Sequence, residues 1–152
     1  FTEAHVLTET EIFSRYEIIL ESYCKVIGIE ANTMLDMAKK DILPAVSAYS
    51  KELADTAIAK HSLIKDCACS YEEEIVKEIS ELTSELYKAV KALEDAVDKA
   101  TESDVLKLAL YYKDVIIPAM DAVRTPADKL ELITAKKYWP FPTYGDLLFG
   151  VR

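Results

Sequence analysis

Apolar side chains recur at every third or fourth position along most of this chain, the spacing that places them on one face of an α-helix. The first such stripe comprises Ile12, Tyr16, Ile19, Tyr23, Ile27, Ala31, Met34, Ala38 and Ile42. The pattern predicts helices over residues 9–62, 71–100 and 104–136. We therefore expect an all-α fold over residues 1–152, a single domain in which the three long helices pack as an antiparallel bundle.

Prolines stand inside two of these helices without shifting the phase of the apolar stripe. Proline removes a backbone hydrogen bond and clashes with the preceding turn, yet the first stripe resumes in phase at Val46, just after Pro44. We predict a kink near residue 44, whereas a full break there would make four helices. The third helix contains Pro118 and Pro126, and we expect it to kink between them; Thr125 with Pro126 can also be interpreted as a new helix start.

Polar residues mark the expected helix starts. Thr8 and Glu11 have the spacing of a capping box, in which each side chain bonds the backbone of the other residue. Ser70 and Glu73 repeat that spacing before the second helix. Ser103 is placed to cap the third helix.

The last fifteen residues, 138–152, differ in kind from the helices. They hold five of the fourteen aromatic residues in the chain, and the two prolines of the Trp139-Pro140-Phe141-Pro142 run favour extended backbone. The large apolar side chains of this tail would cost roughly 1.5–3 kcal/mol each if they were left in water. We expect an extended aromatic tail that packs on the bundle or on adjoining protein; a polyproline-type ligand for another protein is the alternative.

Composition and charge narrow the class of protein. Three Gly and five Pro in 152 residues are too few for a loop-rich β-sandwich or a βαβ nucleotide fold. A chain that is 51% hydrophobic and 30% charged does not have the composition of a disordered protein. The net charge of −9 argues against nucleic acid or an anionic membrane as the main partner.

Most of the negative charge lies on one stretch of the chain. Residues 71–104 contain eleven acids and four lysines, which is seven of the nine net charges. The simpler interpretation is that these charges lie on an outer helix face in contact with water. The more specific alternative is that they form an acidic surface that binds a basic partner.

The cysteines and the hydropathy indicate a reducing, cytoplasmic location. Cys24, Cys67 and Cys69 are an odd number, unlike the paired cysteines of a secreted disulfide scaffold. No apolar run approaches the roughly 18 residues of a membrane span. The first seven residues suggest no element of their own, so we expect a fragment of a longer chain.

No group of residues has the pattern of a catalytic or metal site. His61, Cys67 and Cys69 lie close together, and Asp66 or Glu72 could complete four ligands, but a single residue between the two cysteines is tighter than zinc sites usually have. The three glycines are isolated, so no phosphate-binding loop is present. We predict no catalytic, cofactor-binding or metal-binding residue in this chain.

The tail carries a resemblance to a known family. Its run Trp139-Pro140-Phe141-Pro142-Thr143-Tyr144-Gly145-Asp146-Leu147-Leu148-Phe149 resembles the C-terminal signature of type III glutamine synthetases, W-P-x-P-x-Y-x-x-L-L-F. The resemblance extends upstream through residues 128–131, 41–45, 30–31 and 14–17. The acidic stretch in the middle of the chain carries no such signature.

The resemblance implies the helical C-terminal domain of an enzyme that makes glutamine from glutamate, ammonia and ATP. Such enzymes use Mg²⁺ or Mn²⁺ and assemble into ring-shaped homo-oligomers, and their catalytic residues precede this segment. The domain itself would then have a structural, assembly or regulatory role. Because the first helix would overhang the shorter second one, we expect its early part, with Arg15, Tyr16 and Glu17, to contact the catalytic domain of the same chain.

Composition and periodicity taken alone favour a different class, a free-standing helical-bundle or coiled-coil interaction module. A metal-storing bundle is a third class. Its di-iron form is excluded, because the residue three positions before each histidine is not a glutamate.

Overall fold

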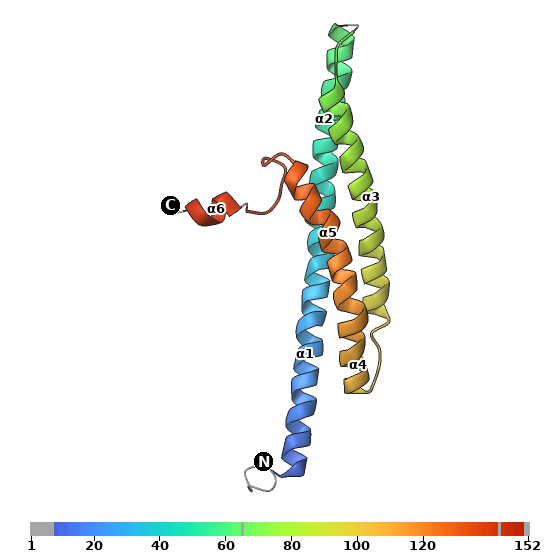
Figure 1. Cartoon of the computed structure of the whole chain (residues 1–152), viewed down its shortest axis with the longest axis vertical. Helices are drawn as coiled ribbons and strands as arrows, with labels where there is room; N and C mark the ends of the chain where they lie inside the picture. The colour runs from blue at the N-terminus through green and yellow to red at the C-terminus, as the bar shows by residue number, and fades with distance from the viewer. Residues whose placement is uncertain (1–7, 65, 143, 151–152) are drawn as a thin grey trace.

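The fold is all-helical throughout the part of the chain that the computed structural model describes, residues 8–64, 66–142 and 144–150. The helical segments are α1 (Glu9–Met37), α2 (Leu43–Leu63), α3 (Ser70–Asp98), α4 (Val105–Tyr111), α5 (Ile117–Ile133) and α6 (Tyr144–Phe149), with two π-helical turns, η1 (Ala38–Ile42) and η2 (Tyr112–Ile116). The segments form an elongated bundle in which α1 and α2 run up one side, α3 returns, and α4 and α5 run up again (Figure 1). The prediction of an all-α antiparallel bundle is confirmed.

Two of the helical stretches continue past a proline, Pro44 in one and Pro118 in the other, and in each case a π-helical turn comes directly before it. The Leu43 N–H bonds the carbonyl of Ala38, five residues back, and Pro44 follows directly. The Ile117 N–H bonds Tyr112 in the same way, directly before Pro118. A wider turn makes room for the proline ring, which would clash with the carbonyl of an ordinary α-turn. The helix therefore continues past each of these prolines and does not break.

Pro126 lies inside α5 without such a turn, and the alternative of a new helix start there is wrong. The hydroxyl of Thr125 donates a hydrogen bond to the Asp121 carbonyl at 3.0 Å, four residues back, rather than capping a helix. The helix ends at Ile133, three residues before the predicted end, because Thr134 adopts extended backbone.

Of the three predicted caps, only the first is confirmed. Thr8 and Glu11 form the complete capping box. The residue that caps α3 is Cys69 rather than Ser70, and it makes no side-chain cap bond; the Glu73 carboxylate of the predicted box lies 4.0 Å from His61 instead. Asp104 caps α4, accepting hydrogen bonds from the backbone N–H groups of two following residues, so the assignment of Ser103 is wrong. An aspartate carboxylate competes well for this position because it also complements the helix dipole.

The core follows α3, which packs against α2 on one side and α5 on the other. Its fully buried side chains come from all three long helical stretches: Val46, Ile79, Leu86, Val90, Leu93, Ile116, Val123 and Leu130. None of the helices in the described part of the chain is long and apolar enough to cross a membrane.

A carboxylate between two lysines ties the first π-turn to α3. Glu94 accepts a hydrogen bond from Lys39 of η1 and another, at 2.9 Å, from Lys91 of its own helix. The hydrogen bonds from Lys39 and then from Lys91 lower the pKa of Glu94 from its ordinary 4.5 to about 2. The ion pair of Glu94 with Lys39 therefore joins η1 to α3 in a way that depends on pH.

We expect Glu94→Gln to destabilise the fold at pH 7 and to make it less sensitive to acid. Because the folded pKa of Glu94 lies below its unfolded value, the stabilisation is complete above about pH 4.5 and is lost as the pH falls toward 2. The difference in free energy of unfolding between wild type and variant should shrink over that range in urea titrations. Glu81→Gln, on an exposed position of the same helix, is the control. A difference that stays constant from pH 7 to pH 2.5 would contradict the assignment.

Candidate functional site

The first half of α1 extends beyond the other helices at the lower end of the bundle (Figure 1). Its residues 9–19 are all exposed, although several are large and apolar. Phe13 and Ile19 are each 66% exposed, and Ile12, Tyr16 and Ile18 are exposed beside them. An exposed apolar surface of this kind marks a contact site in many proteins. We call these five residues the α1 apolar surface.

A groove joins this surface to the start of α4. It has a volume of about 540 Å³ and lies between Phe13, Tyr16, Glu17 and Glu21 on one side and the segment Ser103–Leu106 on the other. Phe13 packs near Tyr16, with ring centroids 6.4 Å apart. Its lining is mixed: each side combines apolar side chains with carboxylates, those of Glu17, Glu21 and Asp104. Such a groove suits a partner with an apolar side chain flanked by a basic or amide group.

The predicted contact residues Arg15, Tyr16 and Glu17 all lie in the first turns of α1, and all are exposed. Tyr16 and Glu17 line the groove, whereas Arg15 does not. The sequence stripe missed Phe13 and Ile18, because both lie off the face that continues into the core. The sequence did contain an indication of them, because Phe13 and Ile18 are apolar residues outside a stripe that was already complete.

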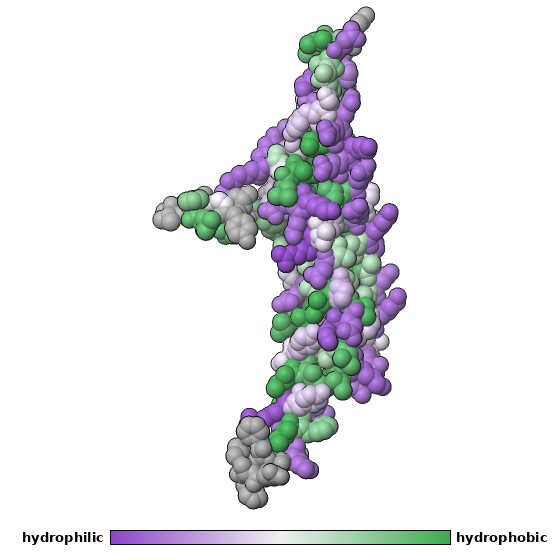
Figure 2. All heavy atoms as spheres, in the orientation of Figure 1, coloured by the Kyte–Doolittle hydropathy of each residue, from purple (hydrophilic) through white to green (hydrophobic). Residues whose placement is uncertain are grey.

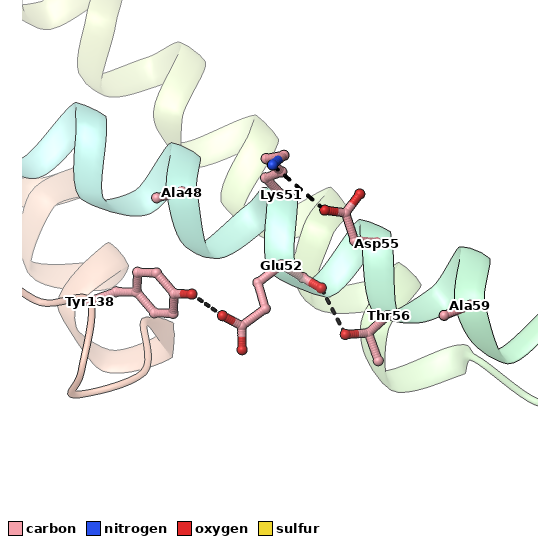
Figure 3. Close-up of a pocket in the computed structure, with 7 residues that line it drawn as sticks. All are labelled: Ala48, Lys51, Glu52, Asp55, Thr56, Ala59 and Tyr138. Carbon is pink, nitrogen blue, oxygen red and sulfur yellow. Dashed lines mark hydrogen bonds and ion pairs between the residues drawn. The ribbon is translucent and has the colours of Figure 1, made fainter.

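One carboxylate of α2 binds the two residues where the tail begins, Lys137 and Tyr138. Glu52 accepts hydrogen bonds from the ammonium group of Lys137, at 2.9 and 3.0 Å, and from the Tyr138 hydroxyl. Figure 3 shows the Tyr138 ring reaching the Glu52 carboxylate across a shallow, open pocket. The pocket has a volume of about 500 Å³, and its other acid, Asp55, pairs with Lys51 at 3.8 Å. Both carboxylates of the pocket are therefore engaged by cations.

The aromatic residues at the start of the tail pack inward. Tyr138, Trp139 and Phe141 lie against the hydrophobic core, and the last two meet edge to face with centroids 6.1 Å apart. The Tyr138 ring lies 5.4 Å from that of Tyr49. A hydrogen bond with Tyr71, and after it burial, raises the pKa of Tyr49 to about 12, so this tyrosine stays protonated at neutral pH. We call residues 138–142 the tail stem.

The rest of the tail differs from the sequence prediction. Residues beyond the stem form the short helix α6, which stands away from the bundle (Figure 1). Leu147, Leu148 and Phe149 are 69–83% exposed, whereas an extended tail packed on the bundle was expected. Pro140 and Pro142 belong to the stem. The side chain of Tyr144 and all of Thr143 lie outside the described residues. No short-range signal distinguished the packed aromatics from the projecting ones.

The residues weighed as metal ligands are placed around the turn between α2 and α3. Cys69 is buried and Cys67 half-buried, and both are free thiols. Glu72 is engaged by Lys60, which lowers the pKa of this glutamate, and His61 lies 4.0 Å from Glu73. Within the described residues, no three histidine, cysteine, aspartate or glutamate side chains are grouped to hold a metal ion.

Comparison with known proteins relates the chain to one enzyme family. Residues 1–61 match the family model described as the glutamine synthetase C-terminal domain. The whole chain aligns with a glutamine synthetase of Butyrivibrio fibrisolvens at 37% identity and covers 22% of that protein. A type-3 glutamine synthetase of Dictyostelium discoideum is 31% identical over 98% of the chain, which covers 21% of its length. A glutamine synthetase of Bacteroides fragilis is 27% identical over 95% of the chain, 20% of its own length. The chain thus spans about a fifth of these relatives.

Proposed function

We propose that this chain, a glutamine synthetase C-terminal domain by its similarity to part of these enzymes, serves such an enzyme as a non-catalytic helical bundle. The parent protein would then be an ATP-dependent glutamate–ammonia ligase of type III, acting in nitrogen assimilation in the cytoplasm as a homo-oligomer. The names of the relatives support this proposal, and so does their greater length. They also favour it over a free-standing interaction module.

The residues of the bundle do not fit the ATP and divalent metal that the parent enzyme would use. The carboxylates of Glu52, Glu72 and Glu94 are each engaged by a lysine, and the described residues hold no group of three side chains that could bind a metal ion. The described segments also lack a glycine-rich turn for phosphates. In this proposal the bundle performs no catalytic step, and the nucleotide and metal would bind elsewhere in the enzyme.

The α1 apolar surface carries the proposal for how the bundle is attached. A single helix with Phe13 and Ile19 in water is unfavourable by roughly 1.5–3 kcal/mol for each side chain, which contact with the catalytic part would recover. The adjacent groove extends this surface onto α4. The catalytic domain of the same polypeptide is the partner that we propose, with Tyr16 and Glu17 at the contact and Arg15 at its edge.

The test is a double substitution, Phe13→Glu with Ile19→Glu, in the full-length enzyme. We expect the bundle to detach, so that its helices become accessible to limited proteolysis and the amides of residues 9–22 exchange faster with solvent. Two charges placed in an apolar contact oppose docking without disturbing the fold, because both positions are exposed in the bundle itself.

Ile58→Glu with Leu63→Glu is the matched control. These two side chains are also exposed and apolar, but they lie on α2 near its turn to α3. The control should leave proteolysis unchanged. Equal protection of residues 9–22 in both variants would refute the docking of α1.

A second experiment addresses the non-catalytic role. Titration of Mg-ATP into the isolated 152-residue chain should release no binding heat. Micromolar affinity in calorimetry would overturn the proposal that the domain holds no nucleotide.

A further inference from the structure

Helix α6 presents a second apolar surface, separate from that of α1. Leu147, Leu148 and Phe149 are consecutive, so at about 100° per residue they spread over about half of the circumference of this six-residue helix, and they are 70%, 69% and 83% exposed. Figure 2 shows apolar side chains on this arm, away from the body of the bundle. A helix this short is not stable in water by itself. Its sequence places apolar residues where an isolated solvated helix would have polar ones.

Contacts at the stem and at Lys136 connect α6 to the bundle. Glu52 anchors Lys137 and Tyr138 on α2, and Trp139 packs on the core. The two prolines of the stem restrict the backbone between this anchor and α6. Lys136 then bonds Asp146 at 2.6 Å, which ties α6 back to the end of the bundle.

The end of α6 is also determined by its sequence. A side chain at position 150 would place its Cβ 2.2 Å from the carbonyl oxygen of Asp146, so only glycine is accommodated there. The chain therefore turns closely over the last turn of α6 directly after Phe149. The anchor, the prolines and the ion pair limit how far α6 can move from the bundle, and the glycine determines where this helix ends.

The size of this surface indicates what kind of partner covers it. Three side chains of this type expose roughly 400 Å² together, about half of the roughly 800 Å² that each side contributes to an independent stable interface. The α6 surface therefore needs a partner that is already held nearby. The enzymes that the chain matches are about five times its length, so the rest of such a polypeptide is a partner that stays close to α6.

We propose that α6 inserts its Leu147, Leu148 and Phe149 side chains into an apolar groove on the part of the glutamine synthetase polypeptide outside this domain. This inference rests on the proposed function, and it adds a second attachment point to that of α1. A tethered segment needs little contact area of its own, because the first contact supplies a high effective concentration. The fixed stem lowers the cost of ordering α6 further.

The experiment places the photo-cross-linking residue p-benzoylphenylalanine at position 149 of the full-length enzyme, followed by mass spectrometry of the cross-linked peptides. The substitution keeps an aromatic side chain at Phe149. We expect cross-links to residues that precede the 152-residue domain. Cross-links confined to the helices of the bundle, in the same copy or another, would overturn the proposal, and so would a yield no higher than at the control position.

The control position is Leu63, which is 85% exposed at the end of α2. A second measurement uses Leu148→Ser with Phe149→Ser, which should increase amide exchange in residues 144–150 of the full-length enzyme at least tenfold. The same variant should leave exchange in α3 unchanged. If the amides of residues 9–22 are protected from exchange but position 149 gives no cross-links, only the α6 proposal fails. If those amides are not protected while the cross-links are present, only the docking of α1 fails.

Discussion

Replacing Leu86 with alanine is expected to lower the free energy of unfolding of the bundle by about 2–5 kcal/mol. Leu86 is fully buried in the middle of α3, where that helix packs between α2 and α5. Removing three carbons there leaves a cavity that rigid neighbouring helices cannot fill. Chemical denaturation of the isolated chain, followed by circular dichroism at 222 nm, measures the loss.

Leu132→Ala is the matched control for this prediction. Leu132 lies near the end of α5 and is 86% exposed, so the same chemical change should cost no more than about 0.5 kcal/mol. Similar losses for the two variants would mean that α3 is not at the centre of the core.

Replacing Gly28 with valine is expected to destabilise the bundle by about 1–3 kcal/mol, the usual cost of overpacking. Gly28 lies in α1 where it crosses η2, and a Cβ there would stand 3.0 Å from the Tyr112 hydroxyl oxygen. Valine gains only a few tenths of a kcal/mol over glycine in helix propensity, which the clash outweighs. The measurement is again the free energy of unfolding in urea.

A double-mutant cycle separates the clash from other effects of the valine. Tyr112→Phe removes the nearest atom, and the ring carbons that remain are 3.7 Å from the new Cβ. The two changes together should therefore cost less than the sum of their separate losses. Ser22→Val, at an exposed position of the same helix, should be nearly neutral. Strict additivity of Gly28→Val and Tyr112→Phe would show that the contact is not the cause.

The two attachment surfaces differ in how the chain presents them. The α1 apolar surface is part of a long helix that the rest of the bundle does not cover, so it is already formed before docking. Helix α6 is presented by a stem of prolines and aromatics, and its position depends on Glu52. Substitution of Glu52 should therefore affect α6 and leave the α1 surface as it is.

Local patterns in the sequence determined most of the secondary structure. The apolar stripe of α3 is a property of neighbouring residues, and it predicted a helix that the structure bounds at Ser70 and Asp98. The same holds for the Thr8–Glu11 capping box, because both of its bonds join residues three positions apart. The in-phase stripe across Pro44 also predicted continuity, although the π-helical turn that permits it was not visible in the pattern.

Tertiary structure decided the features that join distant parts of the chain. Ser70 was a reasonable cap on local grounds, but the Glu73 carboxylate that would complete its capping box lies 4.0 Å from His61 on the preceding helix. The tail is the clearest case, because Tyr138 finds its partner Glu52 at a separation of 86 residues. The sequence by itself determined that the tail is aromatic and not part of the bundle helices. Only the packing of α2 against the stem decided which of its apolar side chains are buried and which are left for a partner, since burial depends on contacts that no local spacing encodes.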